Sequence, residues 1–130
     1  MTKENVMNTT ELQIQGSKIM PNITFKNGIL NIVGRSVINN SSVWSEPVLK
    51  ILFEQSSYSH TTRINIHLDY LNSDSNRALL NLLLLAEKLH NMGKKVEIHW
   101  IYANNDLGML EQGNIFKDLI EVPFNLEAIN

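Results

Sequence analysis

Residues 67–89 read HLDYLNSDSNRALLNLLLLAEKL, and this stretch decides the fold of the 130-residue chain. Its first part continues an alternation of apolar and polar residues that is typical of a half-buried strand. Its last part has apolar residues at helical spacing, which predicts an amphipathic helix. The apolar strand positions are Ile64, Ile66, Leu68 and Tyr70, and the apolar helix positions are Ala78, Leu82, Leu85, Ala86 and Leu89. We call the polar segment between the two elements, residues 72–76 (NSDSN), the corner.

The corner suits either a helix cap or a phosphate group. Ser73 and Ser75 lie where free backbone N–H groups and the positive end of the helix dipole meet. Capping by Ser73, Asp74 or Ser75 is worth about 1 kcal/mol and is the simpler interpretation of the spacing. A phosphate would be stabilised by the helix N-terminus and by Arg77, and it would add about 1.5 to 2 negative charges beside Asp69 and Asp74.

Two leucines of the same helix do not fit its apolar face. At 3.6 residues per turn, Leu80 and Leu84 fall opposite the core positions and one turn apart. Either they form a contact surface near the corner, or another segment of the same domain covers them. If they are exposed, the corner and the leucines make one docking face.

The remaining chain is predicted to alternate strands and helices. The pattern predicts strands over residues 11–15, 19–25, 29–33, 63–70 and 96–102, and helices over 43–55, from the corner to near Met92, and over 107–120. Asn27-Gly28 predicts a hairpin turn, because both residues tolerate positive φ. Pro21 indicates that its strand is an edge strand or begins late. Pro123-Phe124 is expected to close the domain, with a loose tail after it.

This order predicts an α/β fold in a single domain. We expect a mixed β-sheet with an N-terminal hairpin and three helices packed over it, in the STAS-like order β-β-α-β-α-β-α. Residues 1–10 are polar and expected to be a flexible N-terminus, and residues 11–126 are expected to form the domain.

Composition excludes several classes of function. The net charge is −2 and there is no basic block, so no nucleic-acid or membrane partner is expected. The absence of cysteine excludes disulfides, thiolate metal sites and a Cys nucleophile. The N-terminus has no apolar signal core and no stretch reaches the ~20 apolar residues of a membrane span, so a cytoplasmic location is expected.

The sequence offers no positive sign of catalysis. It contains no G-x-S-x-G elbow, no P-loop and no G-x-G-x-x-G. The four histidines lack metal-ligand spacing, so neither a metal nor a cofactor is expected. His67 and His99 lie on the polar sides of their strands and come near one another if those strands pair. A small enzyme acting at a His67/His99 face is therefore kept only as an alternative.

Motifs along most of the chain resemble the SiaC family of bacterial regulatory phosphoproteins. Residues 68–80, LDYLNSDSNRALL, are similar to the family signature L-E-Y-F-N-T-S-S-S-K-A-L-L. Further matches, in the family's order, are GRSV (34–37) with NS (40–41), EPVL (46–49), GKKVEI (93–98), WIY (100–102), Asp106, MLE (109–111), Gly113 and PF (123–124).

The resemblance implies a non-enzymatic switch protein. In the family a dedicated protein kinase phosphorylates a threonine of the corner and a PP2C-type phosphatase removes the phosphate. The unphosphorylated form binds and stimulates a diguanylate cyclase, which makes cyclic di-GMP and favours biofilm formation. Ser73 matches that threonine, with Ser75 as the alternative acceptor. The resemblance and the helix pattern together give the expected partner-binding residues, which are Asn72, Asp74, Asn76, Arg77, Leu80 and Leu84.

Two questions stay open at the level of sequence. Asp74 replaces a serine of the family, and its fixed charge either weakens kinase recognition or partly mimics the phosphorylated state. The order of elements is also that of STAS domains, although the STAS corner signature D-S-[ST]-G is absent. An anti-anti-sigma-like antagonist that docks an anti-sigma-type kinase is therefore the second function considered.

Overall fold

The computed structural model describes residues 11–56 and 61–130. The segment 1–10, expected to be flexible, and most of the loop expected after the first helix lie outside these residues. The strands are β1 Leu12–Ile14, β2 Asn22–Lys26, β3 Ile29–Ser36, β4 Thr62–Leu71, β5 Val96–Ala103 and β6 Phe124–Ile129. The helices are α2 Ser42–Gln55, α3 Ser73–Asn91 and α4 Leu107–Leu119.

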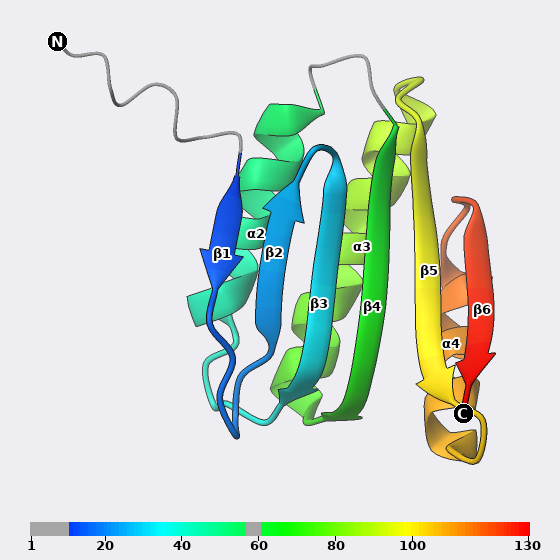
Figure 1. Cartoon of the computed structure of the whole chain (residues 1–130). Helices are drawn as coiled ribbons and strands as arrows, with labels where there is room; N and C mark the ends of the chain where they lie inside the picture. Colours follow the sequence, from blue (N-terminus) through cyan, green and yellow to red (C-terminus); the bar gives the residue numbers. More distant parts are fainter. Residues whose placement is uncertain (1–10, 57–60) are drawn as a thin grey trace, which may run out of the picture.

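The strands form one mixed sheet in the order β1-β2-β3-β4-β5-β6. β1, β2 and β3 are antiparallel, whereas β3 to β6 run parallel to one another. All three helices lie on one face of the sheet (Figure 1), and the core lies between that face and the helices. The predicted α/β single domain, with a hairpin and three helices over a mixed sheet, is confirmed.

The hairpin forms where the sequence predicts it. Asn27 and Gly28 have φ of 54° and 80°, and they join β2 to β3. Pro21 immediately precedes β2, so its strand begins late, in agreement with one of the two alternatives. The other alternative is wrong, because β2 lies between β1 and β3 and is not at the edge.

The tail after Pro123 is not loose. Residues 124–129 form β6, the strand at the far edge of the sheet from β1. Phe124 stacks on Trp100 with ring centroids 6.5 Å apart, and Leu126 packs against the core. The strand predicted over residues 11–15 is present as β1, although the predicted order β-β-α-β-α-β-α counts only two strands before the first helix, and β6 was not predicted. The core contacts of β6 named here come from two apolar residues, Phe124 and Leu126. Two such positions in a short polar segment are too few to give a recognisable strand pattern in the sequence.

Helix α3 has a wider buried face than the sequence predicts. Leu79 and Leu83 are completely buried, in addition to the predicted core positions. The face is wide because α3 contacts α2 as well as β4 and β5. Leu80, predicted to lie opposite the core, is half-buried and packs against it, which corrects that expectation. Leu84 remains 44% exposed.

A β-bulge changes the alternation at the end of β4. Gly34 of β3 pairs with Leu68, but the next residue, Arg35, pairs with Tyr70, so Asp69 is an extra residue in β4. Gly34 has φ of +121°, a conformation that L side chains rarely adopt. Tyr70 is 54% exposed as a result, although simple alternation placed it on the buried face.

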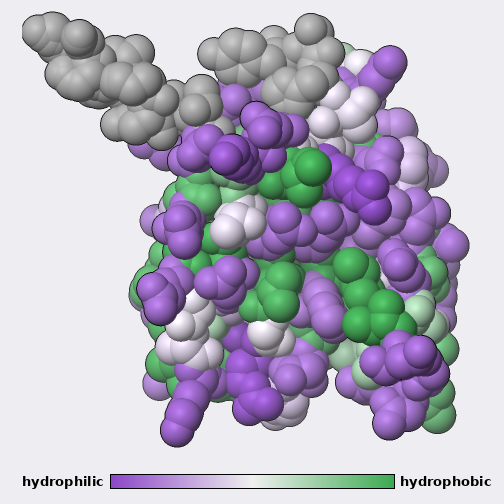
Figure 2. Space-filling view, viewed as in Figure 1, coloured by the Kyte–Doolittle hydropathy of each residue, from purple (hydrophilic) through white to green (hydrophobic). Residues whose placement is uncertain are grey.

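The face of the sheet opposite the helices is bare among the described residues, and Figure 2 shows it to be mixed polar and apolar. His67 and His99 both belong to this face, as predicted. β4 and β5 pair with Asn65 opposite His99, so the two histidines are diagonal neighbours.

Candidate functional site

The corner begins helix α3 with a cap that the sequence pattern did not single out. Asn72 is extended, with φ of −87° and ψ of 177°, and its Oδ1 accepts a hydrogen bond from the Ser75 backbone N–H at 2.9 Å. Its side-chain N–H₂ donates to the Ile38 carbonyl at 3.1 Å, which fixes the corner to the segment after β3. The prediction of capping by Ser73, Asp74 or Ser75 is therefore wrong, because Asn72 is the capping residue and its side chain accepts the Ser75 N–H.

The two serines of the corner have opposite environments. Ser75 is completely buried, and its hydroxyl lies 2.6 Å from that of Ser36. The Trp44 indole N–H donates to the same Ser36 hydroxyl at 3.0 Å. Ser73, in contrast, is exposed. A kinase reaches an exposed hydroxyl directly, whereas Ser75 would have to leave a buried hydrogen-bonded cluster.

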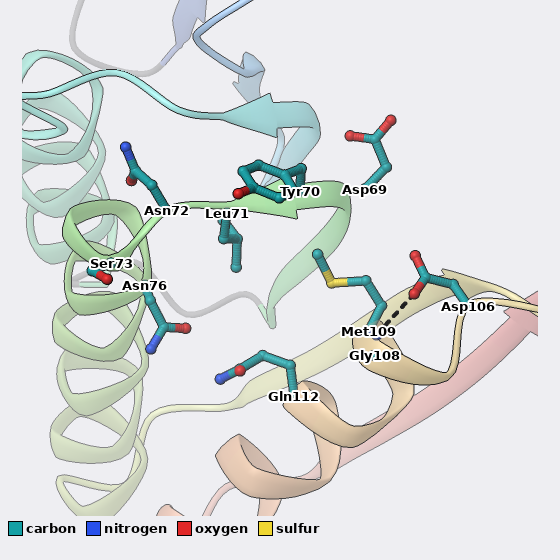
Figure 3. Close-up of a pocket in the computed structure, with 10 residues that line it drawn as sticks. All are labelled: Asp69, Tyr70, Leu71, Asn72, Ser73, Asn76, Asp106, Gly108, Met109 and Gln112. Carbon is teal, nitrogen blue, oxygen red and sulfur yellow. Dashed lines mark hydrogen bonds between the residues drawn. The ribbon is translucent and has the colours of Figure 1, made fainter.

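Ser73 lines a hollow of about 370 Å³ between the end of β4 and the first turns of α3 and α4 (Figure 3). This position follows from topology, because the carboxyl ends of parallel strands and the helices after them meet at one edge of the sheet. We name this space the corner hollow. It is lined by Asp69, Tyr70, Leu71, Asn72, Ser73, Asn76, Asp106, Gly108, Met109 and Gln112.

The charged groups that line the corner hollow are acidic. Asp69 lies 3.6 Å from the Arg35 guanidinium in an exposed ion pair. Asp106 caps α4, its Oδ1 accepting the Met109 backbone N–H at 3.1 Å. A phosphate on Ser73 would thus gain from the α3 N-terminus while adding negative charge beside two carboxylates.

Asp74 belongs to a different hollow on the other side of α3. Its Oδ2 accepts hydrogen bonds from the Ser41 hydroxyl at 2.6 Å and from the Ser41 backbone N–H at 2.7 Å. These bonds tie the start of α3 to the start of α2. Arg77 lines the same hollow and lies 3.7 Å from the Asp74 carboxylate. The structure therefore divides the predicted partner-binding residues, with Asn72 and Asn76 at the corner hollow and Asp74 and Arg77 outside it.

The pKa of Asp74 is held below its ordinary value of 3.8, mainly by the hydrogen bond from the Ser41 hydroxyl and then by that from the Ser41 backbone N–H. Desolvation raises this pKa, and the charge of Arg77 lowers it further. A depressed folded-state pKa stabilises the fold above the ordinary value, and this contribution is lost as pH falls through the folded-state pKa. We predict that Asp74→Asn lowers the thermal midpoint at pH 7. The difference in thermal midpoint between the variant and wild type should become smaller below about pH 4.

A matched set of thermal melts at pH 7 and pH 3 checks this prediction. Ser41→Ala removes the strongest donor, so Asp74→Asn should cost less in that background than in wild type. If Asp74→Asn lowered the thermal midpoint equally at both pH values, or equally in wild type and in Ser41→Ala, the stabilising role of the Asp74–Ser41 hydrogen bonds would be contradicted.

The other sequence candidates lie apart from the corner hollow. Leu84 is exposed about two turns along α3 from Asn76, the last residue of α3 to line the hollow, and Leu80 is half-buried. His99 lies 2.7 Å from Glu97 Oε1, and neither His67 nor His99 lines either hollow. Over residues 11–56 and 61–130, no group of three His, Cys, Asp or Glu is placed to hold a metal. No helix there is long and apolar enough to cross a membrane.

The sequence analysis predicted neither the contribution of α4 to the corner hollow nor the bulge in β4. Met109 and Gln112 come from α4, and Asp69, Tyr70 and Leu71 come from the end of β4, where Asp69 is the extra residue of the bulge. A glycine inside a strand, here Gly34, is a signal for such a bulge. The contribution of α4 follows from the rule that loops after neighbouring parallel strands converge.

Comparisons with known proteins show which chains share this fold. The crystal structure of apo-SiaC from Pseudomonas aeruginosa has a TM-score of 0.85 and 26% identity, over 91% of this chain and 98% of that chain. The crystal structure of the diguanylate cyclase SiaD in complex with its activator SiaC, from the same organism, has a TM-score of 0.86 and 26% identity. The match covers 91% of this chain and 99% of that chain. A P. aeruginosa (strain UCBPP-PA14) protein named as uncharacterized is 25% identical over 122 residues, which is 92% of this chain and 97% of its own length. A model of the SiaC family regulatory phosphoproteins matches residues 14–129, and the chain therefore belongs to this family, as its motifs predict.

Proposed function

We propose that this chain is a non-enzymatic activator of a diguanylate cyclase and that reversible phosphorylation of Ser73 controls its binding. The observation that carries the proposal is the contrast within the corner, where Ser73 is exposed on a hollow and Ser75 is buried. The family membership and the likeness to SiaC, which is described as the activator of SiaD, support the choice of partner.

In this proposal a serine/threonine kinase and a PP2C-type phosphatase act on Ser73 in the cytoplasm. Ser73 is in the first turn of α3, so its phosphate would lie near backbone N–H groups that no side chain caps. Asn72 already satisfies the Ser75 N–H, and Asp74 is engaged with Ser41. The corner can therefore accept a phosphate without giving up its own hydrogen bonds.

The unphosphorylated form is the binding form. A phosphate adds about 1.5 to 2 negative charges to a surface that already presents Asp69 and Asp106. A partner that docks there would have to desolvate this charge, which opposes binding. Asp74 does not supply the same signal, because its carboxylate lies in the hollow on the other side of α3.

A cyclase assay tests the proposed function. The purified chain is added to a diguanylate cyclase from the same host, and the rate of cyclic di-GMP formation is measured. We expect the unphosphorylated chain to raise the rate several-fold and the Ser73-phosphorylated chain to have little effect. A pull-down from native lysate runs beside it, and recovery of an anti-sigma-type kinase without any cyclase would favour the anti-anti-sigma alternative. No change in rate with any cyclase of the host would overturn the proposal.

A further inference from the structure

The corner hollow has the size and lining of a socket for one side chain. Its volume of about 370 Å³ is at the lower end of the range for ligand pockets. Two apolar residues, Leu71 and Met109, lie at its centre in Figure 3, with the Tyr70 ring beside them. Asn76 from α3 and Gln112 from α4 extend toward one another across the space.

The corner itself is held rigidly and offers no obvious element for phosphate to move. Asn72 is bonded to both Ile38 and the Ser75 backbone, and the Ser75 hydroxyl is bonded inside the core. Asp74 is bonded to Ser41 on the far side. A conformational switch needs an element that can adopt two arrangements, whereas every hydrogen bond named here holds the corner in a single arrangement. The hollow is the space that a phosphate on Ser73 can change directly.

The charges restrict what enters the hollow. An acidic side chain would be repelled by Asp69 and Asp106 even without phosphate. A cationic side chain would be attracted more strongly after phosphorylation, which is opposite to release. A neutral side chain with an apolar body and a donor at its tip meets neither difficulty: the body packs on Leu71 and Met109, and the tip donates to a carboxylate or amide oxygen.

We infer that the corner hollow receives one tyrosine or tryptophan of the cyclase and that phosphate on Ser73 prevents binding by taking that space. This inference rests on the proposed function and adds the chemistry of the contact. Aromatic residues with a polar tip are enriched among residues that dominate interface energies. The Met109 sulfur in the hollow also suits contact with an aromatic ring.

Gly108 provides a way to fill the hollow without changing Ser73. It lines the hollow in the first turn of α4, and a Cβ added there would meet only Asp106 Oδ1, at 3.6 Å. The backbone at this position therefore has room for a Cβ, and a thermal melt checks that the longer leucine side chain also leaves the fold intact. Asn114→Leu is the matched control, since Asn114 is an exposed position of the same helix that does not line the hollow.

The test measures binding of the unphosphorylated variants to the cyclase by calorimetry. We expect Gly108→Leu to weaken binding by about tenfold or more and Asn114→Leu to change it less than about twofold. Exposed tyrosines and tryptophans of the cyclase are then changed to alanine one at a time. One of them should weaken binding to wild type about tenfold and have no further effect on Gly108→Leu.

Two results would overturn the inference while leaving the proposed function intact. The first is that Gly108→Leu binds the cyclase as tightly as wild type. The second is that every aromatic substitution in the cyclase weakens its binding to Gly108→Leu as much as its binding to wild type. If the wild-type chain itself fails to bind any cyclase of its host, the proposed function fails instead. Thermal melts of both leucine variants confirm that each is folded.

Discussion

Phosphorylation of Ser73 is expected to weaken binding of this chain to the cyclase proposed as its partner by about 100-fold, or roughly 2.7 kcal/mol. The loss has two sources. The phosphate occupies part of a hollow of about 370 Å³, and it places a dianion beside Asp69 and Asp106, where docking would have to desolvate it. Titration calorimetry with fully phosphorylated and unphosphorylated protein measures the ratio of the two dissociation constants.

Two variants control this experiment. Ser73→Ala should bind the cyclase with an affinity within about twofold of that of the unphosphorylated wild type, since removing one exposed hydroxyl has little effect on folding. Kinase treatment should not change its affinity, because the acceptor hydroxyl is absent. Ser75→Ala should be less stable, because it leaves Ser36 with one partner fewer in the core, but it should still be released by the kinase. A Ser73→Ala protein that the kinase still releases from the cyclase would contradict the assignment of the switch.

Gly113→Ala is expected to lower the free energy of unfolding by about 2 kcal/mol, a drop in thermal midpoint of roughly 8 °C for a chain of this size. An added Cβ would lie 2.5 Å from Cδ1 of Trp100 and 2.7 Å from Cδ2 of Leu126. Trp100 cannot turn aside freely, because its indole N–H donates to the Met109 carbonyl at 2.9 Å and its ring meets Phe116 edge-on. Glycine at 113 thus sets how closely α4 approaches β5 and β6.

Gly108→Ala is the matched control in the same helix. Its Cβ would meet only Asp106 Oδ1 at 3.6 Å, and alanine is favoured over glycine in a helix by up to about 1 kcal/mol. Its thermal midpoint should therefore be equal to or above that of wild type. If both alanine variants melt at the same temperature, close packing at Gly113 does not limit the position of α4.

Local signals in the sequence were enough for most of the fold. The change of period across the corner predicted β4 and α3, and Asn27-Gly28 predicted the hairpin that the structure contains. β6 could not be predicted in this way, because its place depends on contacts of Phe124 and Leu126 with Trp100 of the neighbouring β5 and on contacts with α4. Such contacts between distant residues leave little trace in a window of about ten residues.

The candidate site was predicted in part. The sequence pointed to the corner and to a hydroxyl at the start of α3, but it could not separate Ser73 from Ser75. That separation depends on Ser36 of β3, whose hydroxyl meets that of Ser75 only in three dimensions and also accepts the indole N–H of Trp44 from α2. The same holds for Asp74, whose partner Ser41 is 33 residues away along the chain.

Peptide mass spectrometry of the chain after treatment with the kinase proposed to act on it tests the central claim most directly. Exposure of Ser73 and burial of Ser75 predict one phosphate per chain, on Ser73, and none in Ser73→Ala. Phosphate on Ser75 in a protein that keeps its wild-type melting curve would contradict the account, because it would place the switch inside the core.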